Sequence, residues 1–215
     1  MTRTPDIADV IALKSGAATL FESEIASMFR YWDSMRKSGD VPRRTEIDPR
    51  RIEPLLPQAL IAERIAPGLA RLRIAGSHLS DLMGMEVRGM PLSAFMASED
   101  RPTLADLLTD LFERPARIDL GLQATGARGA AAIKGRLVLL PLRSDLGDIS
   151  RALGCLVTQG PIGTGPHRFT IIARRITPLN VPCDTDFVPS SPAATPARHI
   201  ALPQSGTRPW LRVVK

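Results

Sequence analysis

Aromatic residues are scarce in this sequence, making up 4% of its 215 residues. Leu, Ile, Val, Ala and Met must therefore fill its core, and the hydrophobic share of 44% is normal for a globular protein. Long apolar runs are missing as well, since no window approaches the roughly 18 uninterrupted apolar residues of a membrane-spanning helix. The opening residues, MTRTPDIADVIALK, lack the apolar centre of a signal peptide. We therefore expect a soluble, cytoplasmic protein.

Cysteine and histidine are equally sparse, with two of the first and three of the second. Cys155 and Cys183 form no CxxC pair, so we expect reduced thiols, with Cys155 inert in an apolar strand, and no metal site. His78 is the one histidine inside a helical block and thus the one candidate for a haem ligand. A lone histidine without a partner pattern is more typical of a surface or capping position. The sequence identifies no cofactor.

Catalytic and phosphate-binding motifs are also absent. The chain has no G-x-S-x-G elbow and no H-E-x-x-H pair. It has neither the glycine-rich loop that precedes a Lys and a Ser or Thr nor a G-x-G-x-x-G turn between a strand and a helix. We expect a protein that is not an enzyme and has no catalytic residues.

Positive charge is the most evident feature of what is present, with a formal net charge of +6. Much of it falls in one run whose central residues form a basic patch: Arg43, Arg44, Arg50 and Arg51. The patch is either a solvated basic loop or a surface for an anionic partner such as a nucleic acid or a nucleotide. No aromatic residue interleaves with it after Trp32, and no recognition helix is evident, so nucleic acid is the weaker alternative.

An amphipathic helix is predicted over residues 19–37. Thr19 and Glu22 form a T-x-x-E capping box at its start. Apolar residues then follow in steps of four and three, which places them along one side of the helix: Phe21, Ile25, Met28, Trp32 and Met35. This stripe packs on the chain's own sheet, on the same helix of a second copy, or on both. We expect a homodimer through this helix.

The remaining folded part alternates in blocks of strands and helices. Two strands flank Pro67-Gly68, a block of short helices covers 77–114, and three strands follow. A segment at 167–177 adds a further edge strand or a return segment, and the predicted strands are 58–66, 69–76, 117–125, 131–143 and 149–159. Since strands and helices do not alternate one by one, a doubly wound parallel sheet is disfavoured. The pattern predicts an α+β domain with a five-stranded antiparallel sheet, helices on one face, and the amphipathic helix in front.

Composition divides the chain into three parts. Residues 1–18 form an N-terminal extension, and residues 19–177 form the domain. Residues 178–215 are rich in Pro, Ser, Thr and Ala, which bury too little apolar area to offset the entropy of ordering. We expect this tail to be disordered and its last residues, RPWLRVVK, to be a candidate docking peptide.

Two stretches of the sequence resemble the PAS_5 family of small alphaproteobacterial PAS proteins. Residues 29–57, FRYWDSMRKSGDVPRRTEIDPRRIEPLLP, resemble the opening of that family, and residues 71–89, RLRIAGSHLSDLMGMEVRG, resemble its continuation. The resemblance covers about 20–175. It implies a PAS fold and a role in sensing or protein interaction, without established catalytic residues.

A cluster of methionines and phenylalanines occupies the helical block, which in PAS folds closes over the sheet and forms a wall of the ligand cavity. Methionine is flexible and polarisable, and it is common at adaptable binding surfaces. The cluster either lines a small apolar pocket or fills a core that lacks aromatic residues. The pocket candidates are Met83, Met85, Met90, Phe95, Met96 and Phe112. We expect a single-domain sensory or interaction module of bacterial signalling that acts through a protein partner.

Overall fold

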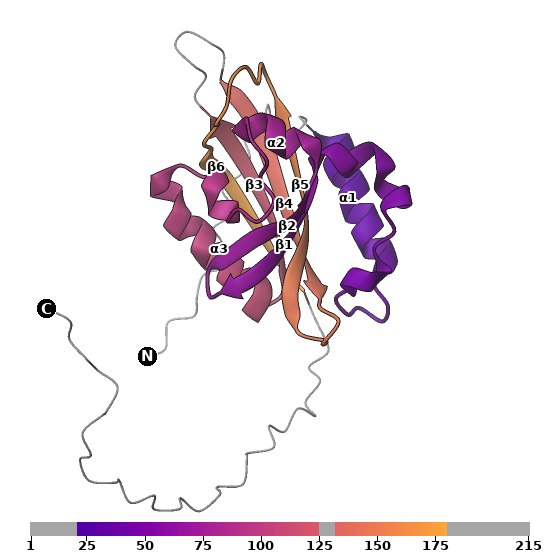
Figure 1. The fold of residues 1–215 in the computed structure, drawn as a ribbon. Helices are drawn as coiled ribbons and strands as arrows, with labels where there is room; N and C mark the ends of the chain where they lie inside the picture. Colours follow the sequence, from indigo (N-terminus) through magenta and orange to yellow (C-terminus); the bar gives the residue numbers. More distant parts are fainter. Residues whose placement is uncertain (1–20, 125–131, 180–215) are drawn as a thin grey trace, which may run out of the picture. The chain divides into compact units, whose positions relative to one another are not determined.

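A six-stranded antiparallel sheet forms the centre of the domain (Figure 1). The computed structural model describes residues 21–124 and 132–179. The strand order is β2-β1-β5-β4-β3-β6, and every neighbouring pair is antiparallel. The strands are β1 (Ala59–Ala66), β2 (Leu69–Ala75), β3 (Ala116–Ala124), β4 (Ile133–Arg143), β5 (Ile149–Gln159) and β6 (Thr170–Pro178). The five expected strands are confirmed, and the segment expected at 167–177 adds β6 beside β3.

The inner face of the sheet carries the helical block. It consists of α2 (Ser77–Met83), the short 3-10 helices η3 (Leu92–Phe95) and η4 (Ser98–Asp100), and α3 (Arg101–Glu113). The apolar face expected for α3 is buried, from Leu104 to Phe112. These helices pack on the inward residues of β3, among them Ile118, Leu120 and Leu122, which alternate with outward residues as a half-buried strand requires.

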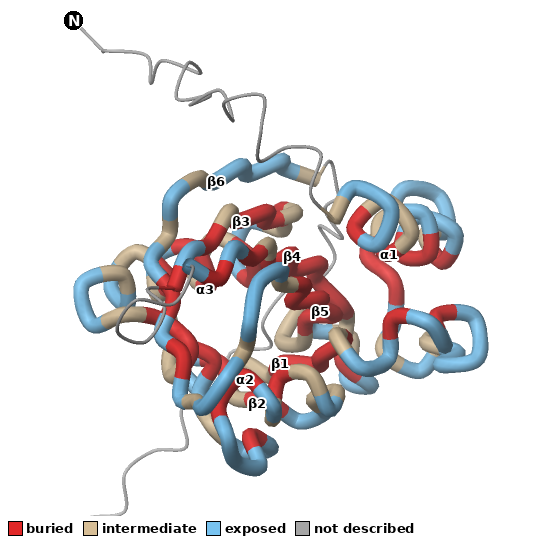
Figure 2. The backbone as a smooth tube through the Cα atoms, turned by 90° about the horizontal axis from the view of Figure 1, so that it is seen from above, coloured by how far each residue is buried: buried red, intermediate tan, exposed pale blue. Residues whose placement is uncertain are grey.

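Helices also cover the outer face, where the sequence placed only the amphipathic helix in front of the domain. The structure has α1 (Glu22–Met35), η1 (Arg44–Glu46) and η2 (Pro49–Gln58), a 3-10 segment with two internal prolines. Seen from above in Figure 2, the sheet lies between α1 and α3. The outer core joins α1 and η2 to the outward residues of β4 and β5. The expectation of helices on one face was therefore incomplete, because a second core forms on the other face.

The apolar stripe of α1 packs inside the chain. Ile25, Met28, Trp32 and Met35 are buried against the outer face, and Phe21 is half-buried. The Trp32 indole Nε1 donates a hydrogen bond to the Pro141 carbonyl oxygen at 3.0 Å. The surface that we expected to form a dimer is thus covered by the chain's own sheet. Burying these side chains is favourable against any apolar surface, and the outer face of the sheet provides one within the same chain. The homodimer stays a prediction that would need another surface.

Hydrogen bonds at both ends hold η2 against its neighbours. The Asp48 side chain accepts a hydrogen bond from the Arg50 backbone N–H, which caps η2 ahead of Pro49. The Tyr31 hydroxyl accepts from the Asp48 backbone N–H at 2.7 Å and donates to its carbonyl oxygen at 3.2 Å. The far end of η2 touches Gly76, whose N–H donates to the Ala59 carbonyl oxygen. Both ends of η2 are therefore held in place by short-range contacts.

Several expectations lie outside the described residues. Thr19 of the predicted capping box is one, so only the start of α1 at Glu22 can be compared. The extension at 1–18, Cys183 and nearly all of the tail at 178–215 are the others. No helix in residues 21–124 and 132–179 has the length and hydropathy that crossing a membrane requires.

Candidate functional site

The methionine cluster of the helical block is packed rather than hollow. Met83, Phe95 and Met96 are almost completely buried in the inner core, and Phe112 is 6% exposed. Met90 is partly buried against the same core, and Met85 is exposed and belongs to no core. None of these six residues lines any of the three cavities described below. Of the two alternatives, the packing favours core filling, and Met85, which follows Gly84 at the end of α2, stands apart from the core.

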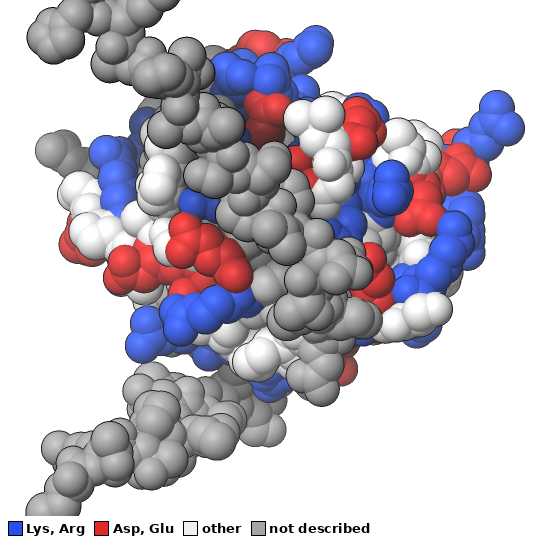
Figure 3. Space-filling model, turned by 90° about the horizontal axis from the view of Figure 1, so that it is seen from below, with Lys and Arg blue, Asp and Glu red and all other residues white. Residues whose placement is uncertain are grey.

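The basic patch lies on η1, on η2 and in the link before them. Arg43, Arg50 and Arg51 are exposed, and Arg44 is half-buried. Among the described residues none of these four forms an ion pair, although the Arg51 guanidinium lies 5.6 Å from the centre of the Tyr31 ring. On the face seen from below in Figure 3, basic and acidic side chains are interspersed. The patch is therefore a set of accessible arginines without an ion pair in the described part of the chain.

An apolar groove lies between η2 and the first hairpin, on the outer face. We call it the η2 groove; its volume is about 230 Å³, and it is lined by Ile47, Pro49, Ile52, Leu56, Ala59, Leu60, Ile61, Ile74, Ala75, Gly76 and Leu153. Leu56 is 38% exposed and Ile74 is 48% exposed. Both are large apolar side chains facing solvent at the edges of a concave surface. Such a surface is typical of a binding site rather than of scattered exposed hydrophobics.

One carboxylate is shared by three arginines beside the η2 groove. Arg71, Arg73 and Arg151 all form ion pairs with Glu63, which lies on β1 two residues after Ile61. Hydrogen bonding to Arg73 lowers the pKa of Glu63, so the carboxylate stays ionised. The Arg151 Nε atom is buried and has no hydrogen-bond partner among the described residues. Because the cluster holds three arginines and one carboxylate, its surplus positive charge favours an acidic ligand.

A polar cavity opens where α1 and α2 begin and where η2 and β5 end. Its volume is about 330 Å³, and its lining is Phe21, Glu24, Gln58, His78, Val157, Thr158 and Gln159. The His78 Nε2 lies 3.0 Å from the Thr158 hydroxyl oxygen. Burial lowers the pKa of His78, which keeps the ring neutral at pH 7. His78 is thus a half-buried residue with a hydroxyl partner, closer to the satisfied histidine that we expected than to a haem ligand.

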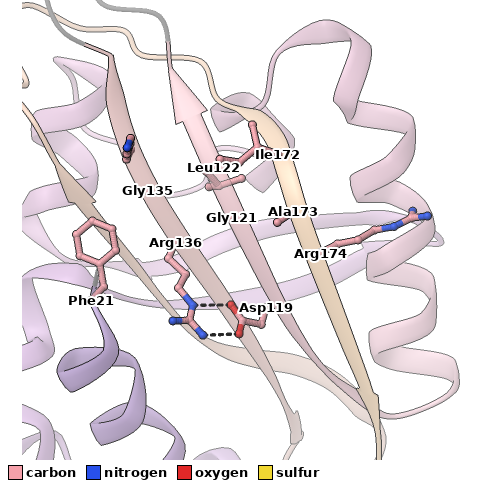
Figure 4. A pocket seen from close by; sticks show the side chains of 10 residues that line it. Phe21, Asp119, Gly121, Leu122, Gly135, Arg136, Ile172, Ala173 and Arg174 are labelled. Atoms are coloured by element: carbon pink, nitrogen blue, oxygen red, sulfur yellow. Dashed lines mark hydrogen bonds and ion pairs between the residues drawn. The ribbon is translucent and has the colours of Figure 1, made fainter. Parts of the chain in front are cut away.

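A smaller hollow lies between β3, β4 and β6 (Figure 4). Arg136 and Asp119 face each other across neighbouring strands and form a two-pronged ion pair at 2.8 and 2.7 Å. Phe21 lies on the other side of Arg136, and Arg174 points away. The hollow has a volume of about 30 Å³, room for about one water molecule, so it cannot take an organic ligand. We regard this ion pair as structural.

Cys155 lies under α1 and is completely buried. Burial raises the pKa of its thiol to about 12, and the charge of Glu24 adds to the effect. The expectation of an inert thiol agrees with this, because the thiolate is the reactive form. No group of three or more His, Cys, Asp or Glu side chains in the described residues could hold a metal ion.

Thiol labelling offers a direct check of this burial. In a Cys183→Ser variant, which leaves Cys155 as the one thiol, we expect an aromatic disulfide reagent at pH 8 to label the native protein at least about a hundredfold more slowly than the unfolded chain. The measurement is the absorbance of the released thiolate against time. Labelling at a similar rate in both states would mean that α1 opens away from the sheet.

Two residues of these sites could not have been chosen from the sequence. Gln58 ends η2 and Thr158 lies near the end of β5, about a hundred residues apart, and nothing in the spacing brings them together. His78 had been noticed, but without its hydroxyl partner. In the sequence, Glu63 is an ordinary polar residue of a predicted strand. Its three arginine partners come from two other strands, which the sequence does not indicate.

Comparisons with known proteins give one family and one solved structure to report. A family model described as a PAS domain, PAS_5, matches residues 21–157, well over half of the chain. The match ends within β5, so β6 lies beyond it. One solved structure is described as "Structure of an RNA-binding Light-Oxygen-Voltage Receptor"; it is 14% identical, with a TM-score of 0.34, over 73% of this chain and 36% of that chain. No curated protein matches.

Proposed function

The chain belongs to the PAS_5 family of PAS domains, and from this premise we propose that it is a sensory and interaction module of bacterial signalling that binds a protein partner in the η2 groove. It acts by binding rather than by catalysis, and in the cytoplasm. The observation that carries the proposal is an apolar concave surface at the solvent boundary, next to a cluster with surplus positive charge. The partner is an amphipathic segment with apolar residues on one side and acidic residues on the other.

The apolar half of the proposal rests on Leu56, Ile61 and Ile74. Ile61 and Ile74 are cross-strand partners on β1 and β2, and Leu56 faces them from η2. A partner side chain of Leu or Phe size gains roughly 1.5–3 kcal/mol when it is fully buried in such a site. The β2 backbone is used elsewhere, since the Leu72 N–H and carbonyl already bond to Met90 and Gly89. Binding therefore uses the groove between side chains rather than an added strand.

The charged half rests on arginines at both ends of the groove. Arg50 and Arg51 lie on η2 without an ion pair in the described part of the chain, and the Glu63 cluster lies on the other side. Acidic residues on the partner would pair with the accessible guanidinium groups of these arginines. Complementary charge mainly raises the association rate and the specificity of binding. An acidic segment fits better than a nucleic acid, because the apolar groove offers nothing for a phosphate backbone.

The test compares two exposed isoleucines at opposite edges of the sheet. Ile74 is 48% exposed and lines the η2 groove, whereas Ile172 is 49% exposed on β6. A photo-crosslinking amino acid at position 74 captures the partner in cells of the source bacterium, and the purified partner is then titrated calorimetrically against Ile74→Asp and Ile172→Asp. We expect Ile74→Asp to weaken binding at least about tenfold and Ile172→Asp to leave it unchanged.

Charge reversal completes this test. The double variant Arg50→Glu, Arg51→Glu should slow association and reduce its dependence on salt, because the steering charges are lost. A captured partner whose binding is insensitive to Ile74→Asp, or a crosslink to nucleic acid alone, would contradict the proposal.

A further inference from the structure

The polar cavity beside His78 contains a buried hydrogen-bonding atom without a partner. Gln58 Oε1 is inaccessible to solvent and accepts no hydrogen bond from any described residue. Nearly all buried polar atoms in native proteins are satisfied, so an exception at the wall of a cavity calls for an explanation. An acceptor left unpaired destabilises the empty protein, and a donor brought into the cavity would relieve that cost. Gln58 Oε1 is therefore a candidate acceptor for a ligand that carries an N–H or O–H donor.

The other polar groups of this cavity are one carboxylate and three groups that can both donate and accept hydrogen bonds, those of His78, Thr158 and Gln159. Glu24 contributes a carboxylate from the exposed side of α1. The His78 ring is neutral at pH 7, because burial lowers its pKa, and Thr158 already holds its Nε2. No lysine or arginine belongs to the lining that residues 21–124 and 132–179 form. The electrostatics disfavour an anion and favour an uncharged or positively charged molecule that donates hydrogen bonds.

The apolar members of the lining set the shape of the ligand. Phe21 supplies an aromatic ring, and Val157 supplies a buried aliphatic surface. A volume of about 330 Å³ lies at the lower end of the range for small-molecule sites. An aromatic ring prefers a flat partner, and it attracts a cation over its face. The cavity thus suits a compact planar molecule.

We propose that this cavity binds a compact planar nitrogen base, uncharged or cationic, with N–H donors directed at Gln58 Oε1 and at the Glu24 carboxylate. The flat face of the ligand packs on Phe21. The site is distinct from the η2 groove, although η2 contributes a residue to each. It gives the module a small-molecule input, and its test does not depend on any protein partner.

Three probes of nearly equal shape test the charge and donor requirement. Benzamidine is a cationic donor, benzamide is a neutral one, and benzoate is an anion without donors at neutral pH. Each is titrated into the full chain at pH 7.5, with calorimetry for affinity and amide chemical shifts of Val157 and Thr158 for location. We expect saturable binding of benzamidine, weaker binding of benzamide, and binding of benzoate at least about tenfold weaker than that of benzamidine.

Variants at the two acceptors make the test specific. Gln58→Leu removes the unpaired acceptor, so it should raise the melting temperature of the empty protein while weakening both benzamidine and benzamide at least about fivefold. The matched control is Gln123→Leu, at an exposed glutamine on β3 outside the cavity, which should change neither. Glu24→Gln should weaken benzamidine and leave benzamide unchanged, because only the first carries a charge.

Several results would overturn the proposal. One is benzoate binding as well as benzamidine, which would mean that the acceptors do not select the ligand. Another is a benzamidine titration without saturation or without shifts at Val157 and Thr158. A third is Gln58→Leu binding both donors as tightly as the unaltered chain. None of these results bears on the η2 groove, so the two proposals fail separately.

Discussion

Gly76→Ala should unfold the domain at a markedly lower temperature than the unaltered chain. A Cβ atom at position 76 would lie 2.1 Å from the Pro57 carbonyl oxygen and 2.2 Å from that of Leu56. Both obstacles are backbone atoms, so no side chain can turn aside. The backbone at Gly76, with φ −71° and ψ 163°, suits any residue, which means that the close approach of η2 is the whole cause. We expect a loss of at least about 3 kcal/mol, the upper part of the range for overpacking.

Thermal and urea unfolding measure this loss, and a loss of this size lowers the melting temperature by roughly 6–12 °C in a domain of about 150 residues. The control is Gly121→Ala, because the new Cβ there would meet the Ala173 side chain at 3.2 Å, a contact that a small shift relieves. The control should stay within about 1 kcal/mol of the unaltered chain. Equal stability of both variants would show that η2 does not lie against Gly76.

Trp32→Ala should be the most damaging single truncation on α1. The side chain is fully buried, its indole N–H bonds the Pro141 carbonyl, and the guanidinium groups of Arg36 and Arg117 lie 5.2 and 4.9 Å from the ring. Removing a buried tryptophan costs about 3–5 kcal/mol through lost burial and the cavity left behind. Each cation–ring contact adds on the order of 0.5–1 kcal/mol. The free energy of unfolding should therefore fall by about 4–7 kcal/mol.

Urea unfolding followed by circular dichroism measures this change. Trp32→Phe keeps a ring but loses the N–H donor, so its cost should be intermediate. Phe29→Ala, at a half-buried aromatic residue of the same helix, should cost less than either. If Trp32→Ala cost less than about 1 kcal/mol, α1 would not be docked on its own sheet as a stable element, and the expected dimer through this helix would regain weight.

Periodicity predicted α1, α3 and β3 well because each of them buries mainly one face. The alternation in β3 and the four-and-three steps in α1 follow directly from which side chains must leave water. Periodicity says that Trp32 is buried but not what covers it, so the choice between the chain's own sheet and a second copy needed the structure. Asp119 shows the same limit: it alternates with the inward residues of β3, yet it is only 7% exposed beside its pair with Arg136.

The candidate sites were less predictable than the fold for a physical reason. Residues far apart in the sequence form them: Gln58 and Thr158 line one cavity, and Glu63 pairs with Arg151. Single residues carry no signal for such pairs, whereas runs of apolar residues do. The methionine cluster was ambiguous in the sequence, because flexible side chains suit the wall of a binding pocket and a dense core equally well. The nearly complete burial of Met83 and Met96 favours the dense core.

The short segment η2 separates the two cavities by only two positions. Leu56 faces the apolar groove, and Gln58 faces the polar cavity. The end of η2 lies close against Gly76, so we expect a displacement of Gln58 to shift Leu56 as well. A small molecule that draws Gln58 toward itself would then change the affinity of the groove. Thermodynamic reciprocity then requires a partner bound in the groove to change the affinity for the small molecule by the same factor. The segment η2 would couple the two binding sites.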